Sequence, residues 1–103
     1  MRQLISIKQG DADTLTETIT GLDSLAGFTA KLYIVDSAGV AVDTITGIIT
    51  DLEIAYEILN EASKLYPIGI HNFETKIWDS SDHVYTPTTG KFVVESVIEK
   101  DPS

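Results

Sequence analysis

The stretch Phe28-Thr29-Ala30-Lys31-Leu32-Tyr33-Ile34-Val35 decides the fold class of this 103-residue chain. All of its even-numbered residues are apolar, whereas the positions between them begin with Thr29, Lys31 and Tyr33. Because successive side chains of a strand point to opposite faces, this period of two predicts a half-buried β-strand. Tyr33 is then expected on the outward face.

The residues that follow predict the partner of this strand. A polar turn at Asp36–Gly39 leads into the run Val40–Ile45, and Gly39 can take the positive φ that a tight turn needs. The two stretches together therefore predict a β-hairpin.

A second hairpin is predicted further along the chain. His71–Trp78 alternates between an inward and an outward set, turns through Ser80-Ser81 and returns as His83–Tyr85. After a break at Pro87–Gly90, Lys91–Ile98 is predicted to be the last strand.

The composition also favours strands. Isoleucine, valine and threonine make up 32 of the 103 residues, and these β-branched types pack well on a pleated sheet. Turn signals recur about every ten residues, as in sandwiches and barrels. We therefore expect an all-β chain of about seven strands.

The run Thr14–Thr20 has threonine at every second position, which leaves Leu15, Glu17 and Ile19 on the other face. One carboxylate would then point into the core, unless a bulge or an edge position frees it. We expect an edge strand.

The segment Leu52–Tyr66 fits two patterns, because its apolar residues match either a helix face or a strand face. We predict a strand to Leu59 and then one helical turn at Asn60–Leu65. Asn60 is a good N-cap residue, and Pro67 ends whatever precedes it.

Length and charge narrow the class of protein. One domain is expected over residues 1–103, with a frayed tail at 99–103. The chain has no cysteine, so disulfides and sulfur-held metal sites are excluded. A net charge of −9 argues against nucleic-acid binding. No signal peptide is recognised, and the apolar runs are too short for a membrane-spanning helix.

No catalytic constellation is found. The sequence lacks a Gly-x-Ser-x-Gly elbow and a phosphate-binding glycine loop. His71 is expected in the core with both ring nitrogens hydrogen-bonded, and His83 in solvent beside a turn. Asp79–Asp82 contains oxygen ligands for a hard cation, but a hairpin turn explains these residues better. We expect no enzyme, no metal site and no cofactor.

The residues that we predict for an interface are aromatic. Tyr33, Trp78 and Tyr85 fall on or near outward positions, and exposed aromatic residues with a polar tip are favoured in protein interfaces and sugar-binding platforms. Two explanations of these residues stay open, contact with another protein and plain packing in which a neighbouring loop covers Trp78, and both are favoured over stacking on a sugar.

Four landmarks along the chain resemble a known family. They are Gly10-Asp11 before a threonine-rich strand, Leu25-Ala26-Gly27-Phe28, Leu65-Tyr66-Pro67-Ile68-Gly69, and Gly90-Lys91-Phe92-Val93-Val94. From Ile7 to Val97 their order resembles the immunoglobulin-like module of tailed-bacteriophage structural proteins, such as the N-terminal domains of baseplate and of tail or head-fibre proteins. In that family an aromatic residue follows two positions after the corner glycine. Here Leu65 and Gly69 match, His71 takes the aromatic position and Phe73 comes next.

This resemblance implies an immunoglobulin-like antiparallel β-sandwich that acts as a non-enzymatic virion protein. Its partners would be other virion proteins and copies of itself, and its place would be the virion, assembled in the host cytoplasm. Nucleic acid, membrane and small-molecule substrates are not expected. The alternative is a carbohydrate-binding or adhesion module on the same architecture. A mimic of DNA that uses the acidic surface ranks last.

Overall fold

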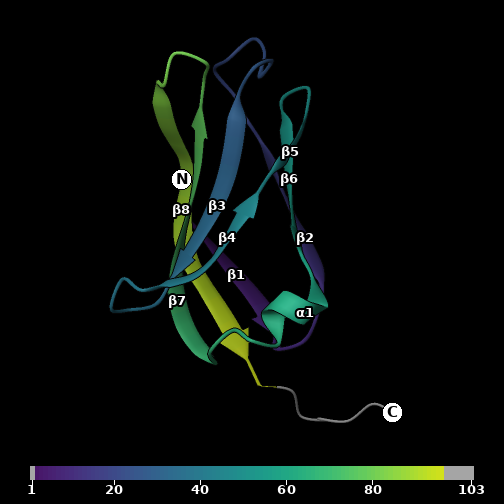
Figure 1. Ribbon diagram of the computed structural model, residues 1–103, viewed down its shortest axis with the longest axis vertical. Coiled ribbons are helices and arrows are strands. Elements are labelled where there is room, and N and C mark those ends of the chain that lie inside the picture. Colours follow the sequence, from purple (N-terminus) through teal and green to yellow (C-terminus); the bar gives the residue numbers. More distant parts are fainter. Residues whose placement is uncertain (1, 97–103) are drawn as a thin grey trace.

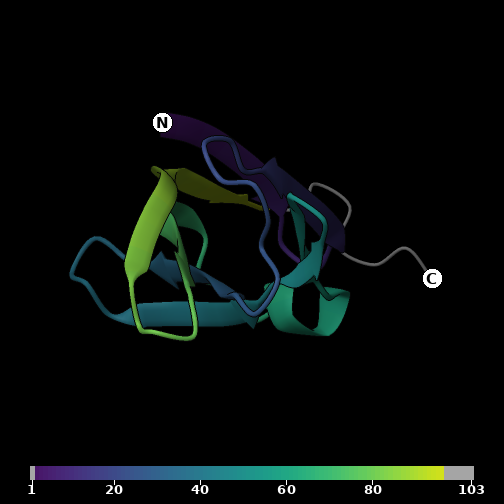
Figure 2. The same cartoon turned by 90° about the horizontal axis from the view of Figure 1, so that it is seen from above.

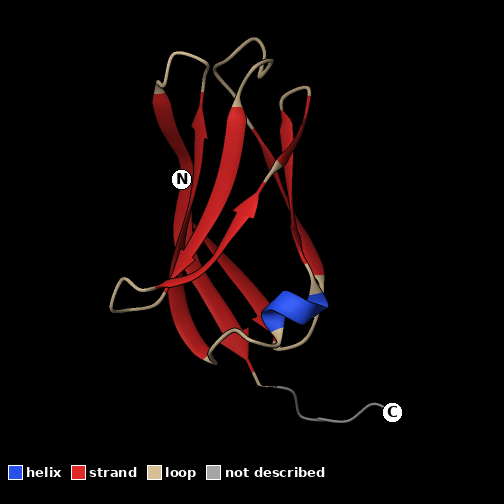
Figure 3. Ribbon diagram, in the orientation of Figure 1, coloured by secondary structure: helices blue, strands red, loops and turns tan. Residues whose placement is uncertain are grey.

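The structure is a computed structural model that describes residues 2–96, and strands dominate it (Figures 1 and 3). The elements in chain order are β1 (Arg2–Lys8), β2 (Asp13–Thr18), β3 (Thr29–Val35), β4 (Ala41–Thr46), β5 (Ile48–Thr50), β6 (Glu53–Ile58), α1 (Asn60–Ser63), β7 (Gly69–Trp78) and β8 (Val84–Glu95). The all-β prediction is confirmed. The tail predicted at 99–103 lies outside the described residues.

The strands form two sheets that pack face to face, as the view from above shows (Figure 2). One sheet has the strand order β1-β8-β7-β3-β4, and the other has the order β2-β6-β5. All neighbouring strands are antiparallel except β1 and β8, which are parallel. Eight strands replace the expected seven or so, because a turn at Asp51, with φ of 55°, separates β5 from β6.

The core lies between the sheets and contains the side chains that alternation placed inward. On β3, Ala30, Leu32 and Ile34 are at most 1% exposed. Ile54 of β6, in the facing sheet, and Phe92 of β8, in the same sheet as β3, belong to the same core cluster, and both are fully buried. Burying side chains of this size contributes roughly 2 kcal/mol each to folding.

The predicted break at Pro87–Gly90 is wrong, because β8 runs through it as one strand of 12 residues. The register of β7 and β8 shifts between Thr75 and Ile77, so β8 has a bulge close to Pro87. A bulge accommodates the missing N–H of proline, and β1 pairs with β8 only from Thr89 onward.

The segment Leu52–Tyr66 contains the predicted strand, now β6, followed by the predicted helical turn. The helix is shorter than expected and begins at Asn60, so the N-cap prediction is wrong. Leu59 occupies that position in extended conformation, since the chain passes from β6 directly into the helix, and it makes no side-chain cap. Ser63, the last helical residue, is fully buried.

Hydrogen bonds tie this helix to the loop between β1 and β2. The Ser63 hydroxyl donates to the carbonyl oxygen of Asp11 at 2.6 Å and accepts from the N–H of Gly10 at 3.1 Å. Gln9 Nε2 donates to the carbonyl oxygen of Tyr66 at 2.9 Å. One end of the sandwich is therefore closed by a satisfied polar network. The only helix in residues 2–96 is α1, and none there meets the length and apolarity that crossing a bilayer requires.

Candidate interaction surface

The outer surface of the five-stranded sheet carries two of the three predicted aromatic residues. Tyr33 and Trp78 both point outward and are partly exposed, as alternation predicted. They are not adjacent, because Trp78 pairs with Thr29, four residues from Tyr33 along β3. The row Lys31–Lys76 lies between them.

Tyr85 lies apart from the other two, and its strand position is an inward one, whereas the prediction placed it on or near an outward position. It pairs with buried Ile77, so it has the inward parity of β8 beyond the bulge. It is 43% exposed and packs against Phe28, with ring centroids 6.4 Å apart. The bulge therefore moved it off the face that simple alternation had given it.

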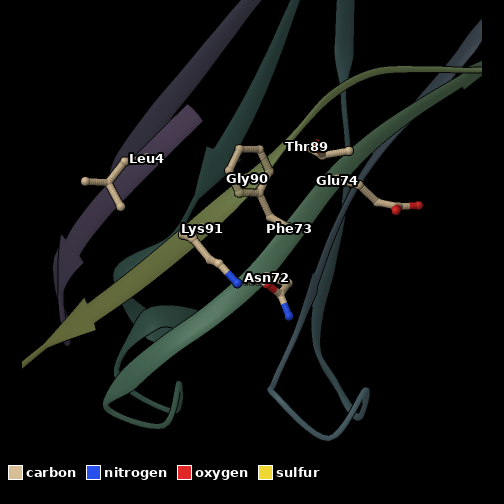
Figure 4. Close-up of a pocket in the computed structure, with 7 residues that line it drawn as sticks. All are labelled: Leu4, Asn72, Phe73, Glu74, Thr89, Gly90 and Lys91. Atoms are coloured by element: carbon tan, nitrogen blue, oxygen red, sulfur yellow. Dashed lines mark hydrogen bonds between the residues drawn. The ribbon is translucent and has the colours of Figure 1, made fainter. Parts of the chain in front are cut away.

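A hollow of about 390 Å³ crosses β1, β8 and β7 on this same outer surface (Figure 4). Its lining consists of Leu4, Asn72, Phe73, Glu74, Thr89, Gly90 and Lys91. A second hollow of about 370 Å³ shares the segment 72–74 and extends to Tyr33 and Val35. The two hollows together give this sheet a shallow, continuous depression.

Lys91 lines the first hollow and Lys76 lines the second. We call the outer surface around Lys31, Lys76 and Lys91 the basic face. Lys31 and Lys76 are direct cross-strand neighbours, a pairing of like charges that disfavours the isolated sheet. Lys76 Nζ lies 2.9 Å from Glu74, and Lys91 Nζ donates to Asn72 Oδ1 at 2.7 Å. Lys31 Nζ lies 6.0 Å from the Trp78 ring centroid, the outer limit of a cation–π contact.

The outer surface of the three-stranded sheet has the opposite character, and we call it the acidic face. Glu53 and Glu57 of β6 are exposed there on either side of Ala55. Ile48 pairs with Ala55 and is 56% exposed. β2, β5 and β6 contain no basic residue, and Glu53 and Glu57 are the acidic residues at their outward positions. The strands of the other sheet contain five basic residues and three acidic ones.

A polar cluster that the sequence did not predict lies between the sheets. β2 is an edge strand as expected, but Glu17 still turns inward, where both the Thr75 and the Thr88 hydroxyls donate to its Oε2. Glu17 Oε1 and the hydroxyl of Tyr56 are buried and make no hydrogen bond within residues 2–96. Burial, and next the Glu17 carboxylate, raise the pKa of Tyr56 above its usual range. Only the inward parity of Glu17 hinted at this cluster.

Neither histidine is hydrogen-bonded to this cluster within the described residues. His71 is buried as predicted, but only Nε2 has a partner, the Pro67 carbonyl oxygen at 2.7 Å. Nδ1 has none among the residues described, which corrects the prediction for that nitrogen. His83 is exposed as predicted and contacts Asp79 at 3.0 Å.

The turn at Asp79–Asp82 is stabilised by local hydrogen bonds to the Asp79 side chain. Backbone N–H groups of Ser81 and His83 donate to Asp79 Oδ1, which lowers the pKa of Asp79 below its usual range, mainly through the His83 bond. This geometry is that of a turn. In the part of the chain that the structure covers, no three His, Cys, Asp or Glu side chains gather to hold a metal ion.

Comparison with solved structures identifies the fold of the chain, whereas the sequence comparisons find no match. No protein-family model and no curated protein sequence matches the chain. The structure of CopC from Methylosinus trichosporium OB3b superposes with a TM-score of 0.59 at 13% identity, covering 94% of this chain and 88% of that one. The fibronectin(III)-like modules of Clostridium thermocellum CbhA give 0.51 at 14% identity, covering 94% and 92%. The chain is therefore an immunoglobulin-like, fibronectin-III-like β-sandwich.

Proposed function

We propose that this chain is a non-enzymatic assembly module in which the basic face of one copy binds the acidic face of the next. The observation that carries the proposal is the opposite charge of the two outer surfaces. A net charge of −9 makes copies repel each other at long range, but salt screens that repulsion beyond about 8 Å at physiological ionic strength. Charges in direct contact are screened less.

The charged groups on the two faces also have similar spacing. Glu53 and Glu57 are four residues apart on β6, a rise of roughly 13 Å. Lys91 lies opposite Asn72, which is four residues from Lys76 on β7, so the two lysines have a similar separation along the sheet. The Lys76–Glu74 ion pair is exposed and worth little, so Lys76 can exchange Glu74 for a carboxylate of another copy.

Apolar side chains accompany the charges on both faces. Leu4 is 72% exposed and Ile70 is 64% exposed on the five-stranded sheet, and Ile48 is exposed on the other. Burying such side chains supplies attraction that salt does not screen. Since the faces differ and point in opposite directions, the contact is heterologous and extends to rings or stacks of copies.

A virion role is the finer part of the proposal. It is supported by the order of the sequence landmarks, which resembles phage structural modules, and it makes other virion proteins further partners. Capsid, portal or tail genes beside the gene for this chain would support it. Their absence would leave the assembly module without the virion.

Sedimentation velocity at rising protein concentration tests self-assembly. In about 0.15 M salt, the average mass should rise above the monomer mass of 11.2 kDa, and it should return toward that mass in about 1 M salt. The variant K76Q/K91Q, which removes the two lysines matched to Glu53 and Glu57, should stay monomeric. A wild-type chain that remains a monomer at millimolar concentration would rule the proposal out.

The geometry does not favour the sugar-binding alternative. A sugar platform needs neighbouring aromatic faces, whereas two lysines separate Tyr33 from Trp78, and Tyr85 packs on Phe28. The aromatic residues of the basic face therefore serve the proposed contact as single anchors.

A further inference from the structure

The two lysines that match Glu53 and Glu57 are not on one strand. Lys76 lies on β7 and Lys91 on β8, so they are about 5 Å apart across the sheet and about 13 Å apart along it. Both glutamates lie on β6. β6 of a bound copy must then cross β7 and β8 at about 20°, close to the angle of about 30° at which aligned sheets pack. The charge pattern fits a sheet-on-sheet contact.

Two arrangements of the bound copy satisfy both ion pairs. In one arrangement Glu57 faces Lys91, and in the other it faces Lys76. In each case Glu53 meets the remaining lysine. β6 and β8 run toward the same end of the sandwich, because β1 is parallel to β8 and hydrogen bonds join the ends of β1 and β6 (Figure 1). The first arrangement is therefore same-direction stacking, and the second is reversed stacking.

The position of Ile48 differs between the two arrangements. Ile48 is 56% exposed on β5 and pairs with Ala55, midway between the two glutamates. Within one copy, β2 lies near β8 through the Glu17–Thr88 hydrogen bond, and β5 follows β4 on the opposite side of the sandwich (Figure 2). Same-direction stacking therefore places Ile48 over β7 and β3. Reversed stacking places it over β8 and β1.

The second hollow, between β7 and β3, offers Ile48 the better surface. Besides the segment 72–74, it is lined by Tyr33, Val35 and Lys76, whereas the first hollow is lined by Leu4, Thr89, Gly90 and Lys91. In same-direction stacking, the residue in the row of Ile48 is Tyr33, which pairs with Glu74. In reversed stacking it is Thr89, which pairs with the same glutamate. An aromatic ring buries more apolar surface against an isoleucine than a threonine does.

We propose that copies stack in the same direction and that Ile48 of each copy seats in the second hollow of the next, against Tyr33. This inference rests on the proposed function and adds the direction of the partner and the residue that sets it. The occupant is a second copy because the carboxylates on either side of Ile48 match the two lysines in their spacing along the strands.

Cross-linking between single cysteines tests the direction, because the wild-type chain contains no cysteine. Thr14 pairs with Glu57, and Leu4 pairs with Lys91. Same-direction stacking therefore places Thr14 over Leu4, whereas reversed stacking places it over Lys31. An equimolar mixture of T14C and L4C should form covalent dimers with a short bismaleimide cross-linker. A mixture of T14C and K31C should form none above the background in about 1 M salt, where the assembly dissociates.

The outcomes separate this inference from the proposed function. Dimers from T14C with K31C would overturn the stacking direction, and so would dimers from neither mixture while the wild-type chain assembles in sedimentation. In both cases the assembly proposal stands. A wild-type chain that does not assemble would rule out both.

Ile48→Ala tests the seat itself. Loss of most of this side chain should weaken self-association about tenfold in sedimentation. The matched control Val40→Ala removes a side chain that is 60% exposed in the turn between β3 and β4, outside both faces, and should leave the association unchanged. An Ile48→Ala variant that associates as strongly as the wild-type chain would overturn the seat.

Discussion

Two buried tyrosines, each beside a carboxylate, end up in opposite situations. Tyr66 is 3% exposed and its hydroxyl donates to Asp43 Oδ2. Tyr56 is 1% exposed and lies near Glu17, yet its hydroxyl makes no hydrogen bond in the described chain. Burial is the main reason that the pKa of each phenol is raised, and it is followed by the Asp43 hydrogen bond for Tyr66 and by the Glu17 charge for Tyr56.

The difference separates a region whose buried polar groups all have partners from one where two of them have none. Around Tyr66 the polar groups satisfy one another, with Gln9 on its carbonyl oxygen and the Phe92 ring edge-on at 6.2 Å. Around Tyr56, the phenol hydroxyl and Glu17 Oε1 have no hydrogen-bond partner within residues 2–96. We therefore expect removal of the first hydroxyl to cost stability and removal of the second to cost none.

The largest expected effect is that of Tyr66→Phe. Removing the hydroxyl leaves the partly buried Asp43 carboxylate without this donor. Hydrogen bonds to charged groups are worth about 2 kcal/mol. Tm should fall by about 10 °C in a thermal melt. The control Tyr33→Phe, on the outer surface, should leave Tm nearly unchanged. Equal melting of Tyr66→Phe and wild type would erase the contrast between the corners.

A smaller effect is expected for Gly47→Ala, which crowds the ring of Tyr56. A methyl group at Gly47 would lie 2.5 Å from Ile54 Cγ2 and 2.7 Å from Tyr56 Cε1, so the ring must move. Overpacking of this kind costs about 1–2 kcal/mol, which a denaturant melt measures. A variant as stable as wild type would mean that the Tyr56 ring is free to shift.

The loss of stability at high pH should reveal the raised pKa of both tyrosines. The unfolded chain loses tyrosine protons near pH 10, while the folded chain keeps those of Tyr56 and Tyr66 because their pKa values are raised. Stability is therefore complete below pH 10 and falls as pH rises above it. Between pH 10 and 11 the fall should be smaller in Tyr66→Phe by up to about 1 kcal/mol, as denaturant melts can measure. Identical pH profiles would contradict the raised pKa.

The smallest effect is expected for Tyr56→Phe. Since the buried hydroxyl has no hydrogen-bond partner within residues 2–96, its removal should relieve a desolvation penalty and raise the free energy of unfolding by about 1 kcal/mol in a denaturant melt. A loss as large as that of Tyr66→Phe would show that Tyr56 is as firmly hydrogen-bonded as its counterpart.

Local sequence patterns correctly predicted the side-chain directions that depend on the backbone of a single strand. Alternation placed Ala30, Leu32 and Ile34 inward and Tyr33 outward, because a strand fixes these directions by itself. It failed at Tyr85, where the bulge in β8 depends on the pairing with β7.

The functional surfaces depend even more on distant pairing. The Lys31–Lys76 row exists only through the β3–β7 register, and Glu17 meets Thr75 and Thr88 across 58 and 71 residues of chain. No pattern within one segment contains these contacts. The inward parity of Glu17 was readable, but what it would meet was not.

The most direct test of the assembly account is sedimentation of a mixture of two neutralised variants. K76Q/K91Q removes the two lysines matched to the glutamates and keeps the acidic face intact, whereas E53Q/E57Q keeps only the basic face intact. Each alone should sediment as a monomer, and their equimolar mixture should form a heterodimer and nothing larger. A mixture that stays monomeric, or variants that assemble alone as wild type does, would contradict the account.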